Sequence, residues 1–394
     1  MKKLLWTALL LALLLTACGA VEPDSAARAP SKDAAPFAEP VQTPEPTPEP
    51  TPEPTPEPTP EPTPMPESWT ITDESPEEIL ALAAVYTLRS VDATASTEYE
   101  ALAQLQRALP DCEIEWLYEF EGAVYDSLTA ESLAPQSNEG VAEALRALPR
   151  VREVDMLACE PDDAEKRALV DEFPDVFFLW HVRFCEWEVR SDITCFSSLR
   201  TGSESSPRYT SEDYALMLRS CKKLRALDLG HNALTDLTDI GRLERLQVLI
   251  LADNPGVTDF SPLGNLSELV YFEGFMCSEV RDFSFLRRLT KMQDLNLSYC
   301  YYLDDISFID DMPEFRNGWF RTTGVGWEDI KPYRDSRPEI DFVIGNPEDV
   351  SSIVYGWRYS PRSMAVRPAF TYWTKVKEFR SWDDIEYDKE AFGE

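Results

Sequence analysis

Histidine and basic residues are scarce in this sequence of 394 residues. Only two histidines occur, His181 and His231, and 37 lysines and arginines stand against 71 acidic residues, so the formal net charge is −34. That charge argues against the basic footprint that nucleic acid or an anionic lipid surface requires, and we expect no nucleic-acid partner. His181 follows an apolar run and His231 precedes a repeated asparagine, so both are interpreted as structural or surface residues.

Signatures of catalysis and of metal binding are missing as well. The sequence holds no G-x-S-x-G, H-E-x-x-H, Walker or dinucleotide-binding pattern. The cysteines outside the amino terminus give no zinc motif, and nothing predicts a disulfide pair. Asp304, Asp305, Asp310 and Asp311 lack the spacing and the glycine of an EF-hand loop and are interpreted as solvated turn acids. We therefore expect no enzyme, no cofactor and no metal site.

Long apolar runs are confined to the amino terminus. A basic start leads into an apolar stretch from Leu4 to Leu15, which predicts a signal peptide over residues 1–17. Its end spells Leu-Thr-Ala-Cys at residues 15–18, which resembles the signal of bacterial lipoproteins. The resemblance implies that Cys18 carries acyl chains such as palmitate, becomes the first mature residue and anchors the protein to a membrane. An ordinary signal with a chance cysteine and an uncleaved anchor are the alternatives.

The sequence between residues 18 and 67 has little to bury. From Thr43 to Pro62 it spells Thr-Pro-Glu-Pro five times, and a variant follows to Pro66. Proline at every second position fixes φ and removes backbone donors, so we predict a disordered, extended polyproline-type linker. At about 3.1 Å per residue, the 24 residues from 43 to 66 reach roughly 75 Å. We interpret the linker as a stalk between the membrane and a folded part; a tolerated low-complexity linker is the alternative.

One apolar phrase, L-x-x-L-x-L-x-x-N, recurs from residue 224 to residue 323. Its closing positions lie 22, 23, 23 and 23 residues apart and are Asn232, Asn254, Cys277, Cys300 and Thr323. A period in the 20s with this pattern is the signature of leucine-rich repeats, in which each unit supplies one short strand that buries its leucines against the next unit. We therefore predict an α/β leucine-rich-repeat solenoid with a curved parallel sheet. The cysteines at the asparagine position, Cys159 included, are interpreted as packing residues.

Longer units flank this array and predict a helical convex side. Each carries the apolar pattern, then a helical pattern ended by Pro110, Pro174 or Pro338, then a strand-like run. Cys159 to Thr323 and Pro174 to Pro338 are both offsets of 164 residues, which supports homologous units. Further expected elements are a strand at 124–128, helices at 140–148 and 211–220, a strand or hairpin at 183–196, and a loop at 201–210.

The chain from about residue 70 onward resembles the leucine-rich-repeat lipoproteins of gut-type clostridial bacteria, in phrases such as 226–232 and 248–254 and in the tail at 354–362. Its Asp-apolar-Ser/Thr pattern resembles the internalin-like class with 22–23-residue repeats, which implies a 3₁₀ turn on the convex side. Gly274, Cys277 and Cys300 depart from the pattern and suggest local irregularity. The resemblance implies fold and location and brings no defined activity. The expected divisions are 1–17, 18–67, 68–223, 224–344 and a tail, 345–394.

The repeat register also predicts a binding surface. If Leu227 and Leu229 point inward, the residues that alternate with them face the concave side. Exposed aromatic residues on such a face are candidates for partner contact. The candidate ligand-binding residues are Asp228, Ile250, Tyr271, Glu273, Phe275, Met276, Asp294, Tyr299 and Trp319. The alternative is that the carboxy-terminal tail folds back and covers them with Trp357, Tyr359, Phe370 and Trp373.

The sequence therefore favours an extracytoplasmic, surface-exposed lipoprotein of the bacterial cell membrane that binds an unknown protein or peptide through its concave face. An envelope scaffold that self-associates is the second hypothesis. An enzyme such as a wall hydrolase is the third, and no set of catalytic residues supports it.

Overall fold

The computed structural model describes residues 66–198 and 208–345, together with 370, 372–373 and 378–379. The predicted signal peptide, Cys18, nearly all of the predicted linker, most of the 201–210 loop, Trp357 and Tyr359 lie outside the described residues. Across the described part of the chain, no helix has the length and apolar character needed to cross a membrane.

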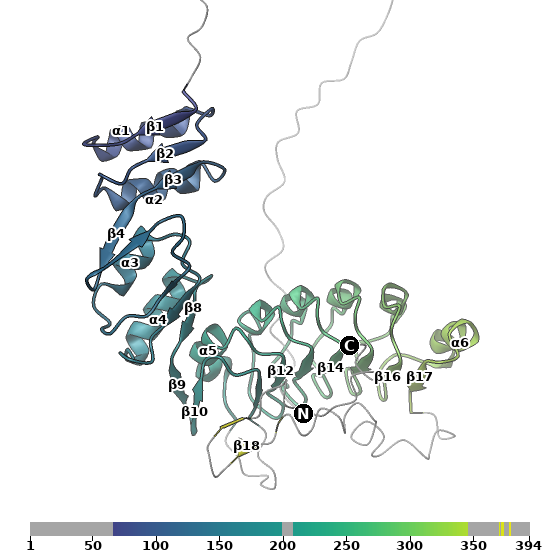
Figure 1. Ribbon diagram of the computed structural model, residues 1–394. Helices are drawn as coiled ribbons and strands as arrows, with labels where there is room; N and C mark the ends of the chain where they lie inside the picture. Colours follow the sequence, from purple (N-terminus) through teal and green to yellow (C-terminus); the bar gives the residue numbers. More distant parts are fainter. Residues whose placement is uncertain (1–65, 199–207, 346–369, 371, 374–377, 380–394) are drawn as a thin grey trace, which may run out of the picture. The chain divides into compact units, whose positions relative to one another are not determined.

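The repeats form one parallel sheet of seven strands in sequence order (Figure 1). The strands are β11 (Cys195–Ser197), β12 (Ala226–Asp228), β13 (Val248–Ile250), β14 (Tyr271–Glu273), β15 (Asp294–Asn296), β16 (Asn317–Trp319) and β17 (Asp341–Val343). Each strand is parallel to its neighbours and pairs with them residue by residue, without a shift. The predicted leucine-rich-repeat solenoid is confirmed.

The leucines of the repeat fill the interior of this solenoid. Leu227, Leu249 and Leu295 lie at the centres of their strands and are fully buried in one core, which spans residues 120 to 342. The side chains of each strand point inward and outward in alternation, so the central leucine of the strand is buried between successive repeats. The interior therefore follows the leucine spacing of the sequence.

The glycines at two inward positions do not disturb this stacking. The ring of Phe260 lies 3.1 Å from where a Cβ of Gly274 would stand, and the ring of Phe320 lies 2.7 Å from that of Gly318. The phenylalanines thus occupy the space that a leucine side chain takes in the other repeats. The expected irregularity near Gly274 was wrong for the strands, because the pairing of β14 with both neighbours runs on unbroken.

Short 3₁₀ helices cover the convex side of the central repeats, as the resemblance implied. They are η2 (Ile240–Arg242), η3 (Ser261–Asn265), η4 (Ser284–Arg288) and η5 (Ser307–Asp311). An aspartate precedes the last three and accepts a hydrogen bond from the backbone N–H two residues later; for Asp259 and Ser261 the distance is 2.7 Å. This side-chain turn sets the backbone direction into each helix.

True helices cover the outer repeats, as the longer units predicted. Two of them, α5 (Ser211–Ser220) and α6 (Trp327–Ser336), adjoin the seven-stranded sheet in sequence. Thr210 caps α5 and Asp162 caps the earlier helix α4 (Asp163–Glu172), each in a reciprocal capping box with the residue three positions later. The predicted helix at 211–220 is confirmed.

Two smaller parallel sheets precede the main one. The first, of order β1-β2-β3, has its own core of thirteen buried residues, which runs from Ile71 to Trp116. The second has the order β6-β7-β8. Their elements are β1 (Ser68–Thr70), α1 (Pro76–Ala81), η1 (Leu82–Ala84), β2 (Ser90–Asp92), α2 (Tyr99–Ala108), β3 (Glu113–Glu115), β6 (Ser132–Leu133), α3 (Val141–Ala147), β7 (Glu153–Asp155), α4 and β8 (Phe177–Leu179).

Two antiparallel hairpins separate the three sheets in the chain. The first joins β4 (Leu117–Phe120) to β5 (Ala123–Asp126), and the second joins β9 (His181–Phe184) to β10 (Trp187–Arg190). The sequence predicted one strand of the first hairpin and left a strand or a hairpin open for the second. It missed that the two are copies, although Glu-Phe-Glu-Gly and Arg-Phe-Cys-Glu stand at their tips.

A buried tryptophan and a serine fix each hairpin to the solenoid. Trp116 donates its backbone N–H to the hydroxyl of Ser127 at 2.9 Å, and this hydroxyl donates to the carbonyl of Ile114. Trp180 and Ser191 repeat the arrangement 64 residues later, with 3.1 Å between Trp180 N and Ser191 Oγ. Because both serines are buried and bonded on both sides, the hairpins are built-in parts of the repeats.

Candidate binding surface

The strand pairing places the predicted concave columns as the sequence indicated. Ala226, Val248, Tyr271, Asp294 and Asn317 are successive partners in one column. The second column holds Asp228, Ile250, Glu273, Asn296 and Trp319. Five repeats thus bring side chains that are up to 91 residues apart in sequence into two parallel rows, and the predicted register is confirmed.

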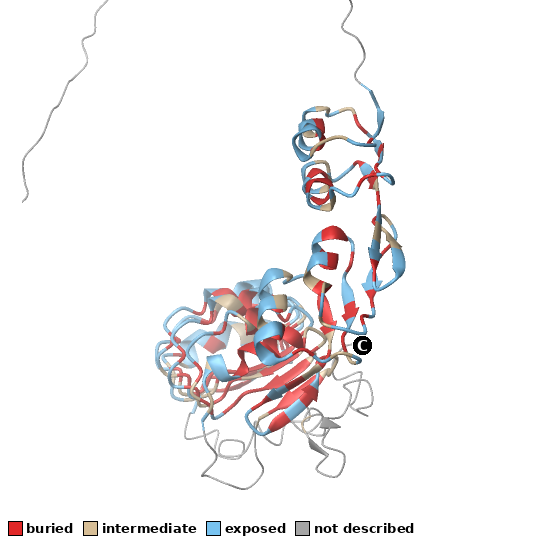
Figure 2. Ribbon diagram, turned by 90° about the vertical axis from the view of Figure 1, so that its left-hand side faces the viewer, coloured by how far each residue is buried: buried red, intermediate tan, exposed pale blue. Residues whose placement is uncertain are grey.

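The centre of this face is much less exposed than the sequence suggested. Asp228, Tyr271, Glu273 and Asp294 are buried, although each alternates with an inward-facing residue of its strand. Figure 2 shows the strands of the main sheet largely in the colour of buried residues. The remaining candidates keep accessible surface; these are Ile250, Phe275, Met276, Tyr299 and Trp319. The predicted exposure is therefore wrong for the four buried residues, while the binding role of all nine stays a prediction.

A second apolar cluster accounts for the burial of Tyr271. Cys195, Ala226, Val248, Val270 and Tyr271 form a group that is distinct from the interior core. Three partly buried residues pack against this concave cluster: Ile250, Trp319 and Phe370. Phe370 is one of the tail residues that the sequence named as a cover for this face, and its position agrees with that alternative.

The polar residues of the columns hold the backbone at the strand ends. Asp228 accepts a hydrogen bond from the N–H of Gly230 at 3.0 Å and another from the hydroxyl of Ser197 at 2.9 Å. Asn296 accepts one from the N–H of Ser298 at 3.1 Å in the equivalent turn. These side chains therefore have a structural task in the turn that ends the strand.

A row of left-handed residues follows the strands. We call it the turn row; its members and φ angles are His231 (59°), Asp253 (55°), Met276 (62°), Tyr299 (66°) and Thr322 (58°). This conformation costs a residue other than glycine about 1–2 kcal/mol. The first four N–H groups offset the cost by donating to the next repeat, as Met276 N does to Ser298 O at 3.0 Å. The row projects five side chains from one edge of the concave face.

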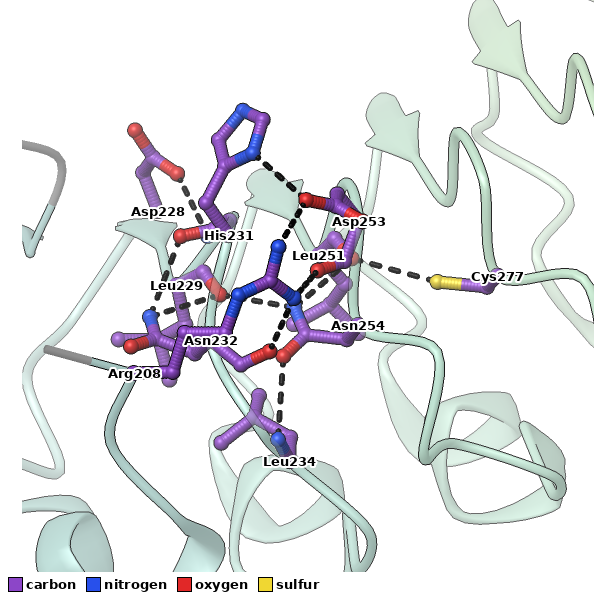
Figure 3. Close-up of polar contacts among 11 residues, drawn as sticks. Arg208, Asp228, Leu229, His231, Asn232, Leu234, Leu251, Asp253, Asn254 and Cys277 are labelled. Carbon is purple, nitrogen blue, oxygen red and sulfur yellow. Dashed lines mark hydrogen bonds and ion pairs between the residues drawn. The ribbon is translucent and has the colours of Figure 1, made fainter. Parts of the chain in front are cut away.

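The side chains at the asparagine position, next to the turn row, close each repeat (Figure 3). We call them the closing ladder; its members are Asn232, Asn254, Cys277, Cys300 and Thr323. Asn254 is fully buried, donates to the carbonyls of Leu229 and Leu251 at 2.9 Å each, and accepts from Leu234 N at 3.1 Å. Cys277 replaces it in the next repeat, where the thiol donates to the carbonyl of Leu251 at 3.3 Å. A thiol makes one weak bond in place of three, so the later repeats close with fewer polar contacts.

The thiols of this ladder are structural, as predicted. Burial raises the pKa of Cys277 to about 12 and raises the pKa of Cys300 as well, so neither forms the reactive thiolate at neutral pH. Cys159, the third cysteine at an asparagine position, is half-buried with its sulfur 3.7 Å from the carbonyl of Met156. The seven cysteines within the described part of the chain are all free.

Arg208 ties the turn row to the start of the array (Figure 3). Its guanidinium donates to a carboxylate oxygen of Asp253 at 2.6 Å and to the backbone carbonyl of Asn232 at 3.4 Å. His231 Nδ1 lies 3.0 Å from the same carboxylate oxygen. Since the histidine is exposed and paired with an acid on the surface, its position agrees with the interpretation of a surface residue.

The exposed part of the surface is aromatic and extends beyond the predicted residues. Phe275 and Tyr299 form an edge-to-face pair with ring centroids 5.4 Å apart, and Met276 is 41% exposed beside them. Tyr301 and Tyr302 follow in the next turn and are 57% and 41% exposed. We call these five residues the aromatic edge. The sequence prediction missed both tyrosines because they follow the closing Cys300; two adjacent aromatics in a polar turn were the available signal.

Arg281 orders one end of the aromatic edge. Its guanidinium carbon lies 3.8 Å from the ring centroid of Tyr302, and one nitrogen donates to the Tyr302 hydroxyl at 2.7 Å. A cation over an aromatic face contributes about 0.5–1 kcal/mol at an exposed site. The tyrosine is thereby held in one orientation while its ring stays accessible.

No cluster of three potential metal ligands occurs among the residues that the structure describes. Asp305 accepts hydrogen bonds from the backbone and hydroxyl of Ser307, which lower the pKa of its carboxyl. His181 contacts Glu160 at the surface. The described side chains at this surface are therefore mainly aromatic residues and charged residues in surface pairs.

Comparison with known proteins adds little detail. No protein-family model matches the chain, and no curated protein sequence matches it. Solved structures that resemble it include internalin C2 of Listeria monocytogenes (18% identity, 55% of this chain and 77% of that chain, TM-score 0.29) and the internalin InlF of the same species (13%, 71% and 87%, 0.28). A leucine-rich-repeat protein of Leptospira interrogans is 12% identical over 67% of this chain and 74% of that chain, with a TM-score of 0.28.

The values in these comparisons are too low to place the chain in a family. The sequence period, the seven parallel strands and the closing ladder are properties of the chain itself. On that basis the protein is a leucine-rich-repeat protein with an α/β solenoid.

Proposed function

We propose that the protein is a lipid-anchored extracytoplasmic lipoprotein that binds a protein or peptide partner at the exposed edge of its concave face. The observation that carries the proposal is the aromatic edge, where Met276, Tyr301 and Tyr302 are between 41% and 57% exposed and lie within three residues in sequence of a member of the Phe275–Tyr299 pair. Exposed apolar residues that cluster on a folded domain mark interaction sites more often than scattered ones do.

The chemistry of the edge suits a protein partner. Tyrosine and methionine are enriched at protein interfaces, and a few large anchors supply most of the binding energy. The Phe275–Tyr299 pair and the contact of Arg281 with Tyr302 hold rings in place before binding, which reduces the entropy lost on association. The left-handed backbone at Met276 and Tyr299 fixes their Cα–Cβ directions in the same way.

The anchor rests on the sequence alone. The apolar run that ends in Leu-Thr-Ala-Cys supports lipidation at Cys18, and the proline-rich stretch supports a spacer between lipid and repeats. Exchange of Cys18 for serine tests this half of the proposal. We expect Cys18→Ser to release the protein from the membrane fraction; a variant that stays there and carries the same lipid would refute the anchor.

The binding half is tested with the double variant Met276→Ala/Tyr299→Ala. Tyr86→Ala is the matched control, because Tyr86 is 75% exposed and lies outside the repeat array. Proteins captured from native envelopes are identified by mass spectrometry and each is purified and measured pairwise. Binding that falls at least about tenfold in the double variant and is unchanged in the control supports the proposal. Equal binding by all three forms contradicts it.

The same protein also tests the scaffold alternative. Sedimentation of the protein alone reports self-association, which a binding protein of this kind does not require. If the wild type sediments as an oligomer and the double variant as a monomer, the edge is an interface between copies and the partner proposal is wrong.

A further inference from the structure

The three parallel sheets begin in the same way. Each starts with one short strand, β1, β6 or β11, and we call these the lead strands. Trp69, Leu133 and Phe196 are equivalent residues of the lead strands, because each pairs with a buried apolar residue at the same position of the following strand. Leu133 and Phe196 are 3% and 0% exposed, whereas Trp69 is 39% exposed. The first lead strand is therefore much less covered than the other two.

The antiparallel hairpins cover the two later lead strands. Phe120 of the β4–β5 hairpin belongs to the core of the repeats that follow it, and its ring lies 3.4 Å from where a Cβ of Gly140 would stand at the start of α3. In the β9–β10 hairpin, the ring centroids of Phe184 and Trp187 lie 5.4 Å and 5.6 Å from that of Phe196. Each hairpin thus packs aromatic rings on the beginning of the repeats that follow it.

The first repeat presents apolar surface at the corresponding place (Figure 1). Its strand β1 lies at the edge of its sheet and pairs only with β2 in the described part of the chain. In α1, Leu80 is 37% exposed, whereas Leu145 and Ala215, each also five residues after the cap of its helix, are buried. We call this first repeat, residues 68–84, the open end. Solenoids are usually closed at their ends by repeats with a polar outer face, so Trp69 and Leu80 depart from that rule.

The backbone of β1 adds hydrogen-bonding groups to the open end. Glu67 and Ile71 make their backbone hydrogen bonds to the β2 side. Because successive residues of a parallel strand bond to opposite sides, the N–H and C=O groups of Ser68 and Thr70 point away from β2. An edge of this kind is a template on which another strand can pair.

The charge of the open end indicates the kind of partner. The sequence from 66 to 81 holds no lysine, arginine or histidine, and its five acids are Glu67, Asp73, Glu74, Glu77 and Glu78. Two copies of this end would repel each other, whereas a partner with basic residues would be attracted.

We propose that the open end is a second binding surface, which accepts a β-hairpin of a partner protein that carries an aromatic residue and basic residues. The partner's aromatic ring packs on Trp69 in the way that Phe184 and Trp187 pack on Phe196 within this chain. The backbone groups of Ser68 and Thr70 bond to an edge of the hairpin, and the acids pair with its basic residues. This surface shares no residue with the aromatic edge, so the proposal goes beyond the binding function described above.

A hairpin of the protein itself supplies the probe. The probe is a backbone-cyclised peptide with the sequence of residues 180–191, in which Cys185→Ser removes the thiol and Glu188→Lys leaves three basic residues against one acid, a net charge of +2. It is cyclised because an isolated two-stranded hairpin is marginally stable in water. A matched control probe also carries Phe184→Ala and Trp187→Ala. Fluorescence anisotropy measures the binding of each labelled peptide to the full-length protein.

We expect saturable binding of the probe to the wild type. The control probe should bind at least about tenfold more weakly, and Trp69→Ala should weaken binding of the probe by a similar factor. Trp69→Phe keeps an aromatic ring and should retain most of the affinity. The aromatic-edge variant Met276→Ala/Tyr299→Ala should bind the probe as the wild type does. Hydrogen exchange at Ser68 and Thr70 in the wild type should slow when the probe is bound.

Several results would overturn the proposal. They are the absence of saturable binding, equal binding of the two probes, equal binding by the wild type and Trp69→Ala, and protection from exchange that lies only outside β1. A wild type that sediments as a dimer while Trp69→Ala sediments as a monomer would show that a second copy occupies the open end.

The test does not depend on any single variant or on the aromatic edge. The comparison of the two probes and the exchange measurement use the wild-type protein, so they decide the question even if Trp69→Ala fails to fold. Loss of probe binding in Met276→Ala/Tyr299→Ala would place the probe at the aromatic edge and also contradict the proposal. Failure here therefore leaves the proposed function standing, and failure of that function leaves this surface to be judged on its own.

Discussion

Replacement of Asn254 by alanine tests the closing ladder most sharply. The side chain is fully buried and makes three hydrogen bonds to backbone groups of two successive repeats. After its loss, the carbonyl of Leu229 keeps a donor from Asn232, and the carbonyl of Leu251 keeps the thiol of Cys277. The N–H of Leu234 has no other hydrogen bond among the described contacts.

The expected cost follows from these contacts. An orphaned buried donor costs about 1–3 kcal/mol and each lost bond about 0.5–1.5 kcal/mol, so Asn254→Ala should lower the free energy of unfolding by about 3 kcal/mol. Asn254→Cys should recover part of this loss, because a thiol at the equivalent position of the next repeat donates to the corresponding carbonyl. Urea denaturation followed by far-ultraviolet circular dichroism measures both variants.

Asn265→Ala is the control, because Asn265 is exposed in η3 and its loss should change the free energy of unfolding by less than about 0.5 kcal/mol. If Asn254→Ala and Asn265→Ala unfold at the same urea concentration, the ladder does not stabilise the array and the reasoning fails.

Three further perturbations test other parts of the fold. Gly241→Ala should destabilise the array by about 1–3 kcal/mol, because its Cβ would stand 2.5 Å from the carbonyl oxygen of Pro262. Gly326→Ala is the control and should be tolerated better, because the nearest atom to its Cβ would lie 3.6 Å away. Thermal melts compare the two variants. Ser191→Ala should lower the free energy of unfolding, measured by urea denaturation, by about 1–3 kcal/mol, because the backbone N–H of Trp180 loses its acceptor. An unchanged free energy of unfolding would show that Ser191 does not anchor the hairpin. Hydrogen bonds from Ser307 lower the pKa of Asp305, so the stability that its carboxylate contributes is present above the unfolded pKa near 3.8 and is lost as the pH falls through the lower folded pKa. Between about pH 5 and pH 2, the melting temperature should therefore fall less steeply for Asp305→Asn than for the wild type. Parallel curves would contradict this.

The repeat array could be predicted nearly to the residue from the sequence. Inward leucines at fixed spacing leave one register in which every strand buries its apolar face, and a slip of one residue would reverse every side chain. For the same reason, the sequence predicts the column that contains Ile250 and Trp319 correctly. The helix at 211–220 had both an amphipathic pattern and a capping threonine.

The exposure of the candidate site could not be predicted in this way. Tyr271 belongs to a cluster against which Phe370 packs from outside the repeats, and Phe370 carries no periodic pattern that assigns it a place on the sheet. The space around Gly274 likewise depends on Phe260, which belongs to the turn of the preceding repeat. Local patterns specify which face a side chain occupies, whereas its exposure depends on what packs there later.

The measurement that tests the central claim most directly is the distance between two members of the turn row. Spin labels on His231→Cys and Thr322→Cys, both at exposed positions, are examined by pulsed electron resonance in a chain that also carries Cys159→Ser and Cys185→Ser. Four steps between parallel strands at about 4.8 Å each predict a narrow distribution near roughly 19 Å. A broad distribution with most distances more than twice as long would show that residues 226–319 do not stack as adjacent parallel strands.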